Sequence, residues 1–167
     1  VRRHTPCKLV LAGGEAIDDP EGPRIFAEVM EAAKDEPDIQ ILLLPPDAHH
    51  EVNALQRASD IIVQKSTREG FGLTVTEAMW KGKPVIGGAV GGIVLQLQDY
   101  NTGFLVHSPE GCAFRIRYLL HRPEMARRMG KMAREFVRHH FLITRKIRDY
   151  LTLMILRENP TERIVEL

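Results

Sequence analysis

Residues 68–79 read REGFGLTVTEAM, and this stretch indicates the fold more strongly than any other part of the chain. It follows the apolar run DIIVQ at 60–64, which predicts a strand, and it leads into a predicted helix at 76–81. Glycines on both sides of Phe71 allow the connecting turn to adopt backbone conformations that other residues avoid. A strand, a glycine-rich turn and a helix in this order predict one unit of a parallel α/β sheet.

Outward from this stretch, short apolar runs alternate with helical patterns. Further strands are predicted at 8–12, 39–44, 84–87 and 104–106, and helices at 25–34, 51–58 and from 110 to about 157, with breaks near Pro123 and Phe141. This order predicts an α/β fold: a Rossmann-like, three-layer sandwich of a parallel sheet between helices, with buried strands and a helical C-terminus. We expect one domain over 1–157 and a tail over 158–167.

The composition is that of an ordinary soluble domain. The 167 residues are 44% hydrophobic and 27% charged, enough for one well-packed core. A net charge of +1 does not favour nucleic acid or an anionic membrane as a partner, and no apolar run approaches the roughly 18 residues of a membrane span. Cys7 and Cys112 are too few for a disulfide framework, and no Cys/His cluster has zinc spacing. We therefore expect a cytoplasmic protein without a metal site.

The turn and helix N-terminus around residues 70–74 are suited to hold a phosphate group. A helix N-terminus presents unpaired N–H groups with a partial charge of roughly +0.5, and such a site needs no lysine. Glu69 and Glu77 lie on either side, and two carboxylates repel a diphosphate unless each faces a hydroxyl-bearing group. A nucleotide-sugar offers that arrangement, with sugar hydroxyls at one end and ribose hydroxyls at the other.

These residues also have simpler interpretations. Thr74 to Glu77 fit a capping box, in which Glu77 bonds back to the N-cap amide, and spacing alone leaves both roles open. Glu69, taken alone, is most simply a solvated loop carboxylate. Phe71 on a loop is more often a core side chain than a ligand contact. The pattern formed by all of them together is less ambiguous.

This pattern resembles the signature of a large family of retaining glycosyltransferases that includes sucrose, sucrose-phosphate and trehalose synthases and has the two-domain GT-B architecture. Seven residues separate Glu69 from Glu77, Gly-Phe-Gly-Leu follows the first, and Glu-Ala-Met closes the motif. The resemblance covers roughly 8–140 and includes 58–61 (ASDI), 82–86 (GKPVI), 90–93 (VGGI), 102–106 (TGFLV) and 127–130 (RRMG). Archaeal-type trehalose synthases, which transfer glucose from a nucleotide donor to free glucose, are similar at 18–22, 51–54, 56–60 and 79–84.

The resemblance implies the C-terminal, donor-binding half of a GT-B fold, lacking the first strand and helix, which supply an Arg and a Lys to the diphosphate in the family. It implies that Glu69 is the catalytic residue, bonding the hydroxyls of the transferred sugar. The implied nucleotide-sugar-binding residues are Gly70, Phe71, Gly72, Leu73, Thr74, Glu77, Leu44 and Pro45. Among them, the amides around 70–74 would hold the distal phosphate, Glu77 the ribose, and Leu44 and Pro45 the base.

The implied reaction transfers glucose, with retention of configuration, from ADP-glucose or UDP-glucose to a sugar acceptor. The expected acceptor is free glucose, and the expected product is trehalose. It requires no cofactor, although Mg²⁺ can accompany the diphosphate. The acceptor would bind through an N-terminal domain missing from this sequence, so we expect the chain alone to be inactive. The alternative is a non-catalytic nucleotide-binding or oligomerisation module. The apolar segment 150–156 favours a homo-oligomer.

The chain departs from the family pattern at three residues in two places. Lys65 precedes Ser66 where the family usually has a Pro-Ser pair, and Lys65 is more often a solvated lysine than a ligand contact at such a place. Val94 and Leu95 replace the Pro-Glu that commonly follows the glycine pair at 91–92. No role is therefore carried over from the family to these positions.

Overall fold

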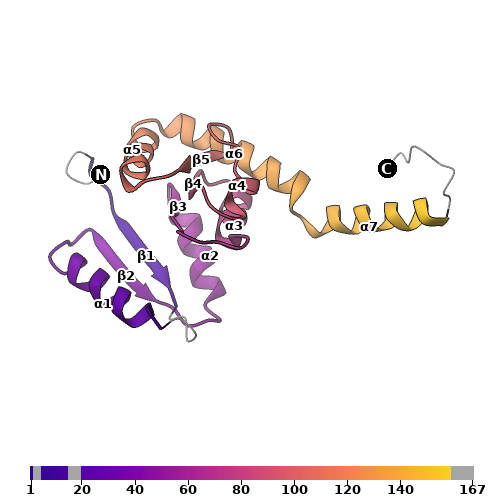
Figure 1. The fold of residues 1–167 in the computed structure, drawn as a ribbon. Helices are drawn as coiled ribbons and strands as arrows, with labels where there is room; N and C mark the ends of the chain where they lie inside the picture. The colour runs from indigo at the N-terminus through magenta and orange to yellow at the C-terminus, as the bar shows by residue number, and fades with distance from the viewer. Residues whose placement is uncertain (2–4, 15–19, 159–167) are drawn as a thin grey trace. The chain divides into compact units, whose positions relative to one another are not determined.

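A computed structural model describes residues 1, 5–14 and 20–158 (Figure 1). The chain divides into two compact units, which we call the first unit (1–58) and the second unit (59–167). Asp18 and Asp19, which contributed to the resemblance, lie outside the described residues, as does the predicted tail beyond Glu158.

The first unit contains β1 (Leu9–Gly13), α1 (Gly22–Ala33), β2 (Ile39–Leu43) and α2 (His49–Ala58). The two strands pair in parallel, with Leu9 opposite Ile39 and Gly13 opposite Leu43. A parallel pair needs a crossover connection, which α1 supplies. The predicted burial of 39–44 is wrong in part, because Leu43 is 53% exposed and every residue of β1 is exposed. The helices of this unit leave these apolar strands partly uncovered.

The second unit carries the remaining elements. They are β3 (Ile62–Gln64), α3 (Leu73–Trp80), β4 (Val85–Gly88), α4 (Ile93–Gln96), β5 (Gly103–Val106), α5 (Pro109–Leu120), α6 (Pro123–His140) and α7 (Ile143–Glu158). The strands form a parallel sheet in the order β3-β4-β5. The described strands therefore form two parallel sheets, and the predicted α/β class with parallel strands is confirmed. The short helix α4 was not predicted, because four residues are too few to show a helical period.

Helices cover both faces of the β3-β4-β5 sheet. Successive strand residues point to opposite faces, and Val85 and Ile86 of β4 accordingly belong to different core clusters. The Val85 cluster contains Val75, Ala78 and Met79 of α3 with Ile93, Leu97, Ala133 and Val137. The Ile86 cluster contains Phe104, Val106, Cys112, Leu119 and Met129, and so draws on α5 and on another part of α6. This unit has the predicted three layers.

The predicted helix breaks after α5 and α6 are confirmed. Ser108 is the N-cap of α5, and its Oγ accepts a hydrogen bond from the Gly111 amide at 3.1 Å. Pro123 is the first residue of α6, where a backbone N–H would have no intrahelical partner, so the lack of an N–H in proline costs no hydrogen bond. The last helix, α7, has no buried residue and exposes the apolar side chains of Ile143, Tyr150, Leu151, Leu153 and Met154. Self-association through this segment stays a prediction. No helix in the described part of the chain is long and apolar enough to cross a membrane.

Candidate functional site

The predicted ligand loop lies between β3 and α3, at the carboxyl end of the sheet. The helix begins at Leu73, earlier than the predicted residue 76, because Gly72 turns the chain into it. Gly72 has φ 86° and ψ 61°, a left-handed conformation that favours glycine. It is the N-cap residue of α3, and no side chain forms a capping hydrogen bond there. The capping-box interpretation with Thr74 as N-cap is therefore wrong, since Thr74 lies inside the first turn. Glu77 is exposed on the same helix.

The loop packs against the turn that precedes α4. A Cβ added to Gly91 would overlap the carbonyl oxygen of Glu69, and one added to Gly92 would overlap that of Gly70. The Gly92 amide donates a hydrogen bond to the Gly70 carbonyl at 2.9 Å. Gly91 itself has φ 49°. Only glycines allow the two turns to approach this closely, so the glycine pair at 91–92 fixes where the loop lies.

Gln96, at the end of α4, makes a second contact with the loop. Its side chain is fully buried, and its Nε2 donates a hydrogen bond to the Phe71 carbonyl. Gln96 was not predicted as a site residue. The only indication was a glutamine at the end of the apolar run IVLQ, where every other residue is hydrophobic.

The carbonyls of Gly70 and Phe71 point toward the segment 92–96, and this fixes the direction of the neighbouring loop amides. The described peptides are all trans, so the N–H of each peptide points opposite to its carbonyl. Because the Gly70 and Phe71 carbonyls bond to Gly92 and Gln96, the N–H groups of Phe71 and Gly72 point away from α4. Within the described residues, the amides of 70–74 donate no hydrogen bond to the protein. Successive free N–H groups at a helix N-terminus form an anion-binding site.

Glu69 is half-buried just ahead of these amides. The Ser66 hydroxyl donates to its Oε2 at 3.4 Å, and the Gln64 side-chain amide donates to the Ser66 hydroxyl at 3.0 Å. The carboxylate is thereby oriented from the end of β3 and is not a freely solvated loop side chain. Phe71 is 46% exposed, with its ring edge-on to Phe141 at a centroid separation of 6.0 Å. The interpretation of Phe71 as a core side chain is wrong.

Leu44 and Pro45 belong to the first unit, at the carboxyl end of β2. The Leu44 amide donates to the Gly13 carbonyl at 2.8 Å, and a Cβ on Gly14 would stand 3.0 Å from the Leu44 carbonyl oxygen. The Pro45 carbonyl accepts from the Ala48 amide at 3.1 Å, next to the start of α2. These two residues thus lie where parallel sheets bind ligands. The other predicted site residues lie in the second unit.

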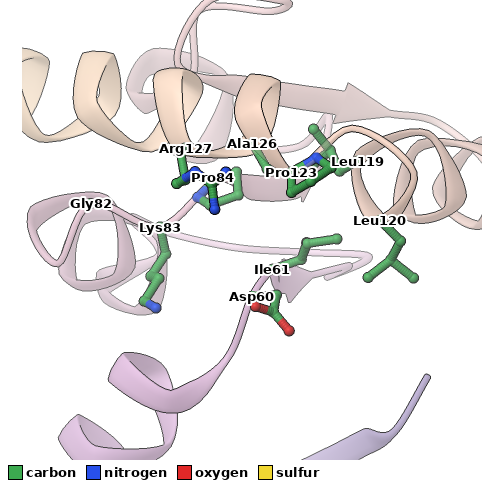
Figure 2. A pocket seen from close by; sticks show the side chains of 10 residues that line it. All are labelled: Asp60, Ile61, Gly82, Lys83, Pro84, Leu119, Leu120, Pro123, Ala126 and Arg127. Atoms are coloured by element: carbon green, nitrogen blue, oxygen red, sulfur yellow. The ribbon is translucent and has the colours of Figure 1, made fainter.

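A cavity of about 310 Å³ lies at the opposite end of the β3-β4-β5 sheet (Figure 2). Its lining residues come from the amino ends of β3 and β4 and from α5 and α6: Asp60, Ile61, Gly82, Lys83, Pro84, Leu119, Leu120, Pro123, Ala126 and Arg127. Ligands of parallel sheets bind at the other, carboxyl end, so this cavity is separate from the loop. No group of three metal-ligating side chains occurs among the described residues.

Comparisons with known proteins match this chain over most of its length. The family model described as "Glycosyl transferases group 1" matches residues 1–136. Trehalose synthase of Pyrococcus horikoshii is 49% identical over 148 residues, which are 88% of this chain and 36% of that protein. Sucrose-phosphate synthase of Thermosynechococcus elongatus has a similar structure, with a TM-score of 0.75 and 26% identity over 93% of this chain and 39% of that one. Anabaena HepE in complex with UDP-glucose has a TM-score of 0.72 at 19% identity, over 89% of this chain and 41% of that one.

Proposed function

The chain belongs to the glycosyl transferases group 1 family, and we propose that its loop 69–77 holds the nucleotide-sugar donor of a retaining glucosyltransferase. The chain spans 36% of the length of the trehalose synthase that it resembles, so the complete reaction is a proposal for the whole protein. One observation supports the proposed donor site. The amides of 70–74 donate no hydrogen bond within the described residues, and along the chain they lie between two glutamates, Glu69 and Glu77, on a loop whose Gly70 and Phe71 carbonyls are bonded inward.

This arrangement suits a diphosphate that carries a hydroxyl-bearing group at each end. The amides of Gly70, Phe71, Gly72, Leu73 and Thr74 would bind the distal phosphate, and the helix N-terminus would stabilise charge that develops on it as it leaves. Glu69, oriented by Ser66, would bond the hydroxyls of the transferred glucose. Glu77 would bond the ribose hydroxyls. The base-binding role that the family resemblance implies for Leu44 and Pro45 stays a prediction.

Retention in this scheme needs no covalent glycosyl-enzyme. Retaining hydrolases place two carboxyl groups on either side of the bond that breaks, one of them a nucleophile. Here the acceptor would attack from the same face from which the diphosphate departs. Glu69 would therefore bind and orient the sugar, and it would not form a bond to the anomeric carbon.

The proposed donor is UDP-glucose or ADP-glucose, and the proposed acceptor is glucose, giving trehalose. The names of the trehalose synthases, 49% identical, support the product, and the UDP-glucose complex of HepE supports the donor class. Mg²⁺ would arrive with the diphosphate. Since Cys7 and Cys112 are both free thiols, we propose a cytoplasmic reaction.

Calorimetric titration of the chain with ADP-glucose, UDP-glucose and GDP-glucose tests the donor site. We expect one of them to bind, and Glu77→Ala to weaken that binding about tenfold or more, as loss of hydrogen bonds to a charged group implies. Glu135→Ala is the control, because Glu135 is an exposed carboxylate on α6 paired with Arg138. Absence of binding at millimolar concentrations of all three would contradict the proposal and favour the non-catalytic module.

A further inference from the structure

Gln96 is a buried polar side chain that makes one hydrogen bond and has one acceptor atom without a partner among the described residues. Its exposed fraction is 0%, and its Nε2 donates to the Phe71 carbonyl. Its Oε1 is also buried and has no hydrogen-bond partner within the described residues. A buried acceptor without a partner destabilises the folded state. An apolar side chain of similar size would fill the same space without that cost.

The contact that Gln96 makes controls the direction of one amide. The Phe71 carbonyl and the Gly72 N–H belong to the same trans peptide, so holding the carbonyl inward directs the N–H outward. Gly72 lies in a left-handed conformation at the start of α3, and a Cβ there would stand 3.2 Å from Cγ1 of Ile93. The peptide is therefore held between α4 and the first turn of α3.

Gly92 holds the preceding peptide in the same way. Its amide bonds the Gly70 carbonyl at 2.9 Å, which directs the Phe71 N–H outward. Two successive peptides of the loop thus have their carbonyls fixed by one short segment, 92–96. The Gly92 contact is made by the backbone amide, whereas the Gln96 contact depends on its side chain.

We propose that Gln96 is a positioning residue of the donor site, which aims the Gly72 N–H and its neighbours at the diphosphate by holding the Phe71 carbonyl. The inference rests on the proposed function for the identity of the ligand. The hydrogen bond and the peptide geometry stand independently of it. Gln96 acts through the backbone of Phe71 and is not itself a catalytic residue.

Gln96→Met separates this role from a structural one. Methionine has a similar length and no donor, so the Phe71 carbonyl loses its partner and the peptide becomes free to turn. The same substitution removes the unpartnered Oε1, which offsets part of the loss of stability. A positioning role therefore predicts weaker donor binding with little change in melting temperature. A structural role predicts a lower melting temperature with unchanged affinity.

Gln98→Met is the matched control. Gln98 undergoes the same chemical change two positions away, but it is exposed and its Oε1 accepts from the Asn101 side chain at 2.8 Å, away from the loop. Both variants are titrated with the nucleotide-glucose that the unmodified chain binds. We expect about tenfold weaker binding for Gln96→Met, corresponding to one lost hydrogen bond, and a change of less than about twofold for Gln98→Met.

A second measurement needs no ligand. The Gly92 amide is protected by its bond to the Gly70 carbonyl, so its hydrogen exchange reports how firmly the loop is held. We expect exchange of this amide to be about tenfold faster in Gln96→Met than in the unmodified chain or in Gln98→Met. Faster exchange together with weaker binding supports the inference.

Unchanged exchange at Gly92 overturns the inference, and so does a lower melting temperature of Gln96→Met with undiminished affinity. If the unmodified chain binds none of the three nucleotide-glucoses, the proposed function fails. The exchange rate of Gly92 then decides alone whether Gln96 holds the loop.

Discussion

Gly91 and Glu69 lie so close together that a Cβ on Gly91 would overlap the carbonyl oxygen of Glu69. This contact joins two turns at the carboxyl end of one sheet, the turn after β3 and the turn after β4. Glu69 precedes the amides of the candidate site, so the position of its backbone sets where they begin. The absence of a side chain at residue 91 is therefore a condition for the shape of the site.

Gly91→Ala is expected to lower the free energy of unfolding by about 2–4 kcal/mol, because it adds a clash to an unfavourable φ of 49°. Denaturant unfolding of the whole chain measures this difference. Gly70→Ala is the comparison, because a Cβ there meets nothing within 4 Å and its φ is not positive. Its effect should stay within about 1 kcal/mol. Equal effects of the two substitutions would contradict the close packing of the two turns.

Gly130→Ala tests the packing of α6 against the end of α3. Alanine ordinarily stabilises a helix interior by about 1 kcal/mol relative to glycine. Here the added Cβ would overlap the Gly82 carbonyl oxygen, so we expect destabilisation of about 2–4 kcal/mol instead. The measurement is again denaturant unfolding.

Gly111→Ala in α5 is the control for Gly130→Ala, because here we expect the free energy of unfolding to rise. Its Cβ would stand 3.5 Å from the Ser108 Oγ and 4.0 Å from the Val106 Cβ, both ordinary contacts. This substitution should stabilise the chain by up to about 1 kcal/mol. A stabilising Gly130→Ala would show that α6 does not approach Gly82 as described.

If the proposed function holds, Glu69→Ala and Glu77→Ala are expected to affect different steps in an enzyme that contains this chain together with an acceptor-binding domain. If Glu77 bonds the ribose, its loss mainly weakens nucleotide binding and raises KM for the donor. If Glu69 bonds the transferred sugar, its loss mainly slows transfer and lowers kcat by about tenfold or more. Steady-state kinetics with the nucleotide-glucose as the varied substrate separates the two effects. Unchanged kinetics in both variants would exclude the proposed roles.

The sequence predicted most elements of the fold, because their patterns are local. The alternation of strands and helices, the end of α3 close to the predicted residue 81 and the break at Pro123 all depend on residues close in the chain. The start of α3 was misplaced because the N-cap is a left-handed glycine, whereas the sequence also offered Thr74 as a cap. The partial exposure of β1 and β2 was not predictable, since apolar composition does not reveal what covers a strand.

The loop itself was recognised from sequence, while its supports were not. Gly70, Gly72 and the two glutamates stand out as a motif, and the structure places Gly72 at the N-cap of α3 and Glu77 inside that helix. Gln96 contacts the loop across 25 positions of chain, and no local pattern encodes such a contact. The orientation of the Phe71 peptide follows from that contact and from Gly92, so it required the folded structure.

The central claim is that the amides of 70–74 bind the diphosphate of a nucleotide-glucose, and backbone amide NMR of the chain tests it most directly. UDP-glucose and ADP-glucose are added in turn while the amide chemical shifts are followed. We predict that the largest changes with one of these donors fall on Gly70 to Thr74, and that Leu119 and Ala126, which line the cavity in Figure 2, change little. Largest changes at that cavity, or no change at 70–74 with either donor, would contradict the account.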